Sequence, residues 1–176
     1  MIAEIGHFAL ALALGVALIQ ATIPFIGAHR QDARWMAVAP PASIAQFGLL
    51  LFAFFALMHA YVTSDFSVVN VVANSHSLKP MLYKISGVWG NHEGSLLLWV
   101  TVMALFGALV AIFGRSIPPG LKARTLAIQA LIAVGFLAFM LLTSNPFERI
   151  FPAPLEGRDL NPLLQDPGLA FHPPML

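Results

Sequence analysis

The chain has 176 residues, of which 59% are hydrophobic and only 10% are charged, and its mean hydropathy is +0.81. Because soluble domains carry about 25% charged residues, this composition excludes an ordinary soluble fold and predicts an integral membrane protein. The formal net charge of +1 gives no sign of a nucleic-acid partner. The absence of cysteine excludes disulfides and sulfur-ligated metals, which leaves histidine as the neutral side chain suited to metal binding.

Four apolar runs predict membrane-spanning helices. About 20 apolar residues cross the hydrocarbon core, and a helix pairs its backbone groups internally, as lipid demands. The first run follows Glu4 and not a basic segment, so it is expected to be an uncleaved span and not a secretory signal. The predicted fold class is an all-α, polytopic integral membrane protein with about four transmembrane helices. The spans, 5–26, 43–62, 95–113 and 126–143, lie within a membrane segment of residues 1–144.

Basic residues predict the orientation of these helices. The loops after the first and third spans are short and basic, so the positive-inside rule assigns them to the cytoplasm. The N-terminus, the long loop 64–94 and the tail 145–176 are then expected on the opposite side, which in a bacterium is the periplasm. Within the long loop, residues 82–89 are expected at the membrane interface. The five basic residues of the short loops are Arg30, Arg34, Arg115, Lys122 and Arg124.

The tail, residues 145–176, contains seven of the 13 prolines. Proline fixes its own φ, lacks an N–H group and favours extended geometry in the residue before it. His172 precedes Pro173 and Pro174, so it is expected outside any helix, on a stiff and extended segment with its ring free to bind a partner. The tail is therefore predicted to be a proline-rich periplasmic loop that presents one candidate ligand.

The other five histidines are less distinctive. His29 and His76 are expected in solvated loops, and His7 lies near the outer interface. His59 and His92 lie at the outer ends of their helices, where an ionisable side chain costs less than at mid-membrane. Two such histidines could bracket a haem iron; a simple interfacial location is the alternative and is favoured.

The densest local pattern is WGNHEGSLLLW, which spans the start of the third apolar run. Glu93 suits the first turn of a helix, and Gly90 and Gly94 permit a tight turn or a close approach of backbone. Trp89 and Trp99 could line an aromatic surface for a flat macrocycle. An interfacial aromatic belt is the alternative, and the chemistry of the residues alone favours it.

The tail also contains the carboxylates Glu156, Asp159 and Asp166 close to Arg158 in the sequence. A paired acid–base site is conceivable, but a salt-bridged, solvated loop is favoured. The sequence contains no phosphate-binding loop, nucleophile elbow or zinc-protease helix. The residues themselves thus predict a four-helix membrane segment that presents His172, without defining a reaction.

Several long stretches resemble a known family. WGNHEGSLLLWV (89–100), TSNPFERIFPAPLEGRDLNPLLQDPGLAFHPPML (143–176) and the opening EIGHFALALALG with the later RQDAR are similar to the amino-terminal part of the cytochrome c maturation haem lyase subunits. This is the CcmF/NrfE cytochrome c assembly family. The resemblance covers the whole chain.

The resemblance implies a role at the outer face of the bacterial inner membrane. Members of the family receive b-type haem from a periplasmic haem chaperone and join it to the CxxCH motif of apocytochrome c through thioether bonds. Their first external haem-ligating histidine lies in the sequence FHPP, which implies that His172 is an axial ligand of the haem iron. The implied partners are the haem chaperone, other maturation subunits, apocytochrome c and membrane lipid, with no nucleic acid.

The family's pattern also extends beyond this sequence. A tryptophan-rich haem-contact segment, a second external histidine and a histidine pair for a membrane-buried haem all follow later in its members. The chain is therefore expected to be a fragment or a split-gene product, incomplete as an enzyme by itself. The alternatives are a membrane scaffold that docks other maturation subunits without binding haem, and an unrelated transporter or respiratory subunit with haem between His59 and His92.

Overall fold

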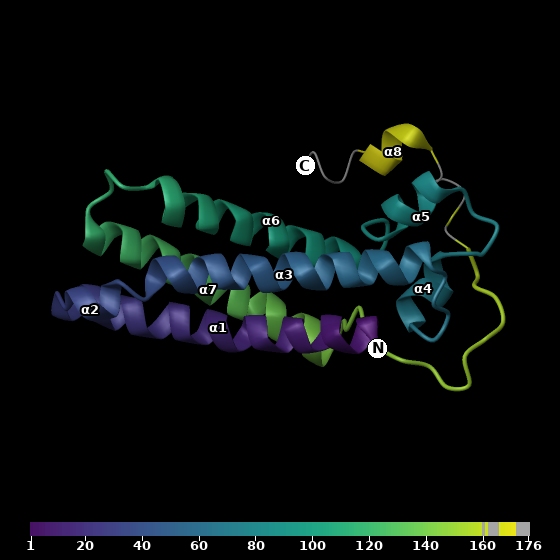
Figure 1. Cartoon of the computed structure of the whole chain (residues 1–176), viewed down its shortest axis with the longest axis horizontal. Helices are drawn as coiled ribbons and strands as arrows, with labels where there is room; N and C mark the ends of the chain where they lie inside the picture. Colours follow the sequence, from purple (N-terminus) through teal and green to yellow (C-terminus); the bar gives the residue numbers. More distant parts are fainter. Residues whose placement is uncertain (160, 162–165, 172–176) are drawn as a thin grey trace.

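A computed structural model describes residues 1–159, 161 and 166–171. Four long helices, α1 (Ile2–Arg30), α3 (Ala39–Val62), α6 (His92–Phe113) and α7 (Pro119–Leu142), lie side by side in an elongated bundle (Figure 1). Each of the four is long and apolar enough to cross a membrane. No strand forms in the described ranges, so the prediction of an all-α, multi-pass membrane protein is confirmed. The short helices are α2 (Ala33–Met36), α4 (Val69–Asn74), α5 (Met81–Gly87) and α8 (Pro167–Phe171).

The long helices extend beyond the apolar runs from which they were predicted. Pro24 lies inside α1 without ending it. Helix α3 begins before Pro40, and α7 begins at Pro119. Proline is tolerated in the first turn of a helix, where its missing N–H has no intrahelical partner to lose. Hydropathy reports only the apolar length of a helix, so these terminal turns were not predicted.

Small residues allow close packing in the bundle. On α1, the buried alanines Ala9, Ala13 and Ala17 recur every four residues, so they share one face of the helix. This face meets α3 and α7, and α6 completes the bundle against both. Small side chains let membrane helices approach closely enough for extensive van der Waals contact. A few polar bonds add to this packing, such as the 3.0 Å bond from Gln20 Nε2 on α1 to the Leu126 carbonyl on α7.

The two ends of the bundle differ in structure. The N-terminus, α4, α5 and α8 gather at one end, whereas α2 and the α6–α7 connection lie at the other (Figure 1). We call α4, α5, the connection between them, α8 and residues 145–159 the cap. The stretch 64–94, predicted as a loop, contains α4, α5 and the first turn of α6. These helices are too short and too polar to produce a hydropathy signal.

Residues 145–159, which we call the strap, run along α4 and beyond it (Figure 1). The strap begins where Phe147, which is 4% exposed, packs against Gly6; a Cβ built on Gly6 would lie 2.7 Å from the Phe147 ring. It continues as extended chain that pairs with loop backbone and α4. The pairing bonds are Val69 N to Glu148 O (2.9 Å), Ile150 N to Ser67 O (3.0 Å), Arg158 N to Val72 O (2.7 Å) and Asp159 N to Ser75 O (3.2 Å).

Candidate functional site at the cap

The WGNHEG motif forms the junction between the cap and α6. Asn91 is the N-cap of α6, and its side-chain oxygen accepts a 2.8 Å hydrogen bond from the Gly94 N–H. A Cβ built on Gly94 would lie 1.6 Å from the Val88 carbonyl oxygen, so no other residue fits here. The close backbone approach predicted for this glycine is thereby confirmed. The Asn91 amide also donates to the Gly87 carbonyl at 2.7 Å, which ties α5 to the start of α6.

A buried polar network joins this motif to α3 and α4. The Tyr61 hydroxyl donates to Asn70 Oδ1 at 2.5 Å and accepts a 3.0 Å bond from Asn91 Nδ2. Asn70 Nδ2 in turn donates to Asn91 Oδ1 at 2.9 Å and to Glu93 Oε2 at 3.0 Å. Tyr61 and Asn70 are both buried, so each bond satisfies a group that water cannot reach. Neither residue was predicted from the sequence, because only the fold brings them to the motif.

Trp89 and Trp99 take different positions. The Trp89 ring stacks on Phe54 of α3 with a centroid separation of 6.3 Å and an interplanar angle of 14°. Its indole N–H donates a 2.8 Å hydrogen bond to the Ala170 carbonyl of α8. Trp99 is 59% exposed on α6. The two rings therefore do not act as one aromatic surface.

The tail, predicted as a proline-rich loop, contains the short helix α8. The Asp166 side chain accepts a 2.8 Å hydrogen bond from the Gly168 N–H, and Asp166 is followed by Pro167 at the first position of the helix. Ala170 is 4% exposed, and α8 lies against α5. An Asp–Pro start is a genuine helix signal, but five residues are too few to show a period. His172, the ligand candidate, lies outside the described residues and follows α8 in the sequence.

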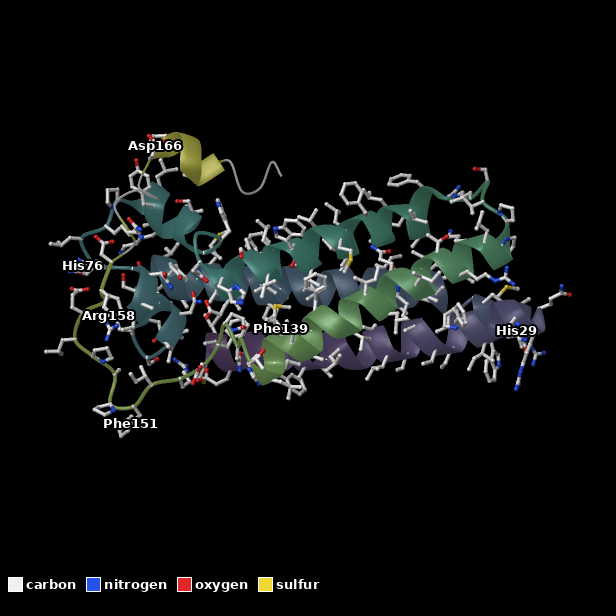
Figure 2. All side chains as sticks on the ribbon, turned by 180° about the vertical axis from the view of Figure 1, so that it is seen from behind. His29, His76, Phe139, Phe151, Arg158 and Asp166 are labelled. Atoms are coloured by element: carbon white, nitrogen blue, oxygen red, sulfur yellow. The ribbon has the colours of Figure 1, made fainter. Side chains whose placement is uncertain are left out.

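A polar cavity of about 280 Å³ opens between α4, the start of α6 and the beginning of the strap. The His92 ring, on this side of α6, meets Phe139 of α7 edge-on at 6.2 Å, and Figure 2 shows Phe139 towards the cap end of α7. Among the described residues, no group of three or more histidine, aspartate or glutamate side chains could hold a metal ion. The polar side chains that line the cavity include those of Asn70, Asn91, His92, Glu93, Asn145 and Glu148.

The remaining histidines lie at separate places in the molecule. His59 is exposed, and no contact between it and His92 is recorded in the described part of the chain. The structure therefore gives no support to a haem held between these two residues. His7 is a joint between α1 and the strap, since its Nδ1 accepts a 3.1 Å bond from Asn145 Nδ2. His76 lies in the cap and His29 at the opposite end of the molecule (Figure 2).

The tail carboxylates are used in structural contacts. Ser77 donates to Glu156 from its N–H at 2.9 Å and from its hydroxyl at 2.6 Å, and these bonds hold the pKa of Glu156 below its usual range. The Lys79 ammonium lies 3.7 Å from Asp159 and donates to the Asn74 carbonyl at 2.9 Å. Burial lowers the pKa of Lys79 to about 8. These contacts match the salt-bridged alternative, with Lys79 as the cationic partner of Asp159.

Arg149 links the strap to two other parts of the chain. Its Nε donates to Glu4 at the start of α1 at 3.0 Å, and its NH1 group donates to Asp65 at 3.2 Å. The Asp65 carboxylate also accepts a 3.2 Å bond from the Ser67 N–H. The N-terminus, the α3–α4 connection and the strap are thus fastened to one guanidinium group.

The fold and the cap define a multi-pass membrane protein with an ordered, polar head at one end of its bundle. The family model described as "Cytochrome C assembly protein" matches residues 89–176, which include α6, α7, the strap and α8. The chain belongs to this cytochrome c assembly family. The predicted resemblance is confirmed.

Relatives agree with this assignment. The chain is 64% identical over 176 residues to cytochrome c-type biogenesis protein ccl1 of Rhodobacter capsulatus, and the match covers 100% of this chain and 27% of that protein. It is 51% identical over 182 residues to cytochrome c-type biogenesis protein CcmF of Escherichia coli, covering 100% and 27%. The solved structure of cytochrome c haem lyase CcmF superposes with a TM-score of 0.78 at 26% identity, covering 84% of this chain and 25% of that one. The chain spans about a quarter of the length of these relatives.

Proposed function

We propose that the chain forms a haem-handling part of a cytochrome c haem lyase in the bacterial inner membrane, with its cap at the periplasmic face. The fold neighbour that carries the name haem lyase supports the activity. The observation that carries the proposal is the seating of α8: the Trp89 indole holds the Ala170 carbonyl at 2.8 Å, two residues before His172 in the sequence. Helix α8 is thereby attached to the head of the bundle.

The distribution of charge supports the proposed orientation. The end opposite the cap holds five basic residues in and beside its two connections, and short basic loops remain on the cytoplasmic side. Two of these residues are bound to backbone there, since Lys122 Nζ donates to the Ala111 carbonyl at 2.8 Å and Arg124 NH2 to the Ala28 carbonyl at 3.2 Å. The cap carries acidic side chains beside its basic ones. This asymmetry predicts a periplasmic cap.

Haem enters this proposal as the substrate. An imidazole nitrogen of His172 donates a lone pair to the haem iron and so fixes the orientation of the macrocycle. Holding the vinyl groups in one position makes their reaction with the thiols of apocytochrome c effectively intramolecular. Each thioether forms when a thiol sulfur bonds to a vinyl carbon and the thiol hydrogen passes to the adjacent carbon. The partners are a haem chaperone, other maturation subunits and apocytochrome c.

Cytochrome c maturation in living cells tests the proposal. In the protein as its gene encodes it, His172→Ala is expected to abolish maturation while membrane insertion is retained. His59→Ala is the matched control, because His59 is exposed on α3 and is expected to leave maturation intact. Maturation at the normal level with His172→Ala would remove this histidine from the mechanism. Loss of maturation with both haem binding and subunit association retained would also contradict the ligand role.

The scaffold alternative makes a different prediction. A scaffold docks the other maturation subunits without binding haem. Co-purification of those subunits with a protein that never retains haem would therefore favour the scaffold over the haem lyase.

A further inference from the structure

We propose that Trp89 is a positioning residue whose indole N–H clamps α8, and with it the chain leading to His172, onto the head of the bundle. The WGNHEG motif lies in the family match, but nothing so far gives its tryptophan a task. The geometry assigns one through the 2.8 Å bond from Trp89 Nε1 to the Ala170 carbonyl. The structural part stands alone; the part concerning haem rests on the function proposed above.

The ring and the backbone of Trp89 are both held in place by neighbouring elements. The Trp89 ring stacks on Phe54, whose side chain is only 7% exposed in the bundle core. The Trp89 backbone N–H donates to the Ser86 carbonyl at 3.2 Å, which ends α5. Two residues later, Asn91 begins α6 and joins the buried Tyr61–Asn70 network. The indole therefore projects from a site whose backbone and ring are both fixed by α3, α5 and α6.

Helix α8, by contrast, depends on outside support. An isolated helix of five residues is unstable, because nucleation costs more than so few bonds return. Its last carbonyl groups have no intrahelical partners. The Trp89 N–H supplies a partner for one of them, and the burial of Ala170 against the cap supplies the rest of the attachment. Removing the indole donor is therefore expected to shift α8 towards a detached state.

Trp89, which lies just before α6, and Trp99, which lies within it, provide a matched comparison. Trp89→Phe keeps an aromatic ring on Phe54 and removes only the N–H donor. Trp99→Phe makes the same chemical change at a residue of α6 that is 59% exposed. The 176 residues contain no cysteine, so Ala170→Cys in an otherwise cysteine-free protein reports on the seating of α8 through the rate of maleimide labelling.

The labelling rates decide the structural claim. Trp89→Phe is expected to raise the maleimide rate of the introduced thiol about two- to tenfold, the range that corresponds to one lost hydrogen bond. Trp99→Phe should leave it unchanged. Equal rates in the two variants would overturn the clamp. If Trp89→Phe fails to insert, Phe54→Leu, which removes the stacking partner but keeps the indole, should raise the rate in the same direction, and no rise would again refute the proposal.

A second readout separates the clamp from the proposed function. In the membrane-inserted protein, Trp89→Phe should raise the haem concentration needed for half-maximal transfer to apocytochrome c while leaving the maximal rate nearly unchanged, because a population of seated α8 remains. His172→Ala should abolish transfer at any haem concentration. Faster labelling with an unchanged haem requirement would mean that α8 is clamped but does not serve haem. Transfer retained by His172→Ala would refute the proposed function and leave the clamp standing.

Discussion

The bundle and the cap are held together by different interactions. Apolar packing of small residues such as Ala13 and Ala17 dominates the bundle, and polar bonds such as that of Gln20 are few. The buried apolar side chains of the cap, such as Val71 and Phe147, join the core of the bundle, and side-chain hydrogen bonds such as that between Tyr61 and Asn70 fasten the cap further. Apolar packing tolerates swaps of similar volume, whereas a buried polar network fails when one member is removed. Single substitutions should therefore act more severely in the cap.

The largest difference is expected between two glycines. Gly94→Ala would bring a methyl group to 1.6 Å from the Val88 carbonyl and should lower the free energy of unfolding by about 4 kcal/mol or more, among the severest effects of one substitution. Gly48→Ala is the control, since nothing lies within 4 Å of its added Cβ. Thermal unfolding in detergent measures both. Similar stabilities would mean that the start of α6 can move away from Val88.

A smaller loss is expected on removing a hydroxyl group from the cap network. Tyr61→Phe leaves buried Asn70 without its 2.5 Å donor and should cost about 1–3 kcal/mol. Tyr83→Phe makes the same change at the only other tyrosine, on α5, for which no hydroxyl bond is recorded among the described residues. The difference between their unfolding free energies tests the network. Ordinary surface substitutions change the free energy of unfolding by about 0.5 kcal/mol or less. A cost of Tyr61→Phe within that range would show that the network contributes little to stability.

Polar bonds in the bundle should contribute less. Gln20→Leu removes the 3.0 Å bond to the Leu126 carbonyl and replaces the amide with an apolar side chain of similar size. The expected loss is about 0.6 kcal/mol, the average for hydrogen bonds between membrane helices. Comparing the unfolding of this variant with that of Tyr61→Phe tests the contrast between the two regions. A larger loss for Gln20→Leu would reverse it.

The smallest effect concerns pH and the strap. The pKa of Lys79 is lowered from 10.5 to about 8 in the folded protein, chiefly by burial. Between these values the unfolded chain binds more protons, so the stability of the cap should rise as the pH increases from 8 to 10. After a discount for solvent screening of this surface pair, the opening equilibrium should still change at least about twofold, chiefly because burial lowers the pKa of Lys79. Chymotrypsin cleavage after Leu155, which is 100% exposed and precedes Glu156, reports this opening.

Lys79→Met is the control for that measurement, because methionine does not titrate. The pH dependence of the protease itself is the same for both proteins and cancels in the ratio of their cleavage rates. The cleavage rate of the natural chain divided by that of Lys79→Met should fall as the pH rises. A constant ratio between pH 8 and 10 would exclude Lys79 as the titrating group.

The contrast between bundle and cap also explains what could be predicted from sequence. Four apolar runs are a strong and local signal, so the four membrane helices were predicted, and the helices extend past those runs, for example at Pro40 and Pro119. The cap depends on bonds between residues distant in sequence, such as the one from Trp89 to Ala170. No periodicity encodes such pairs. Helices α4, α5 and α8 were therefore missed, although the Asp166–Pro167 start of α8 was visible.

The candidate site shows the same division. A close backbone approach at Gly94 was predicted, because the glycines of a short motif are a local signal, whereas the capping role of Asn91 was not. The role of His7 as a joint with Asn145 was not predicted, because the two residues are 138 positions apart. No contact between His59 and His92 is recorded among the described residues, and the role of His172 stays a prediction.

Haem retained by the purified protein, in the form its gene encodes, tests the central claim most directly. Haem would be measured per protein after loading, in His172→Ala and in the control His59→Ala, by absorption spectroscopy. His172→Ala is expected to lose a haem population that His59→Ala keeps. Equal haem content and identical spectra in the two variants would contradict the claim that the cap presents His172 to haem.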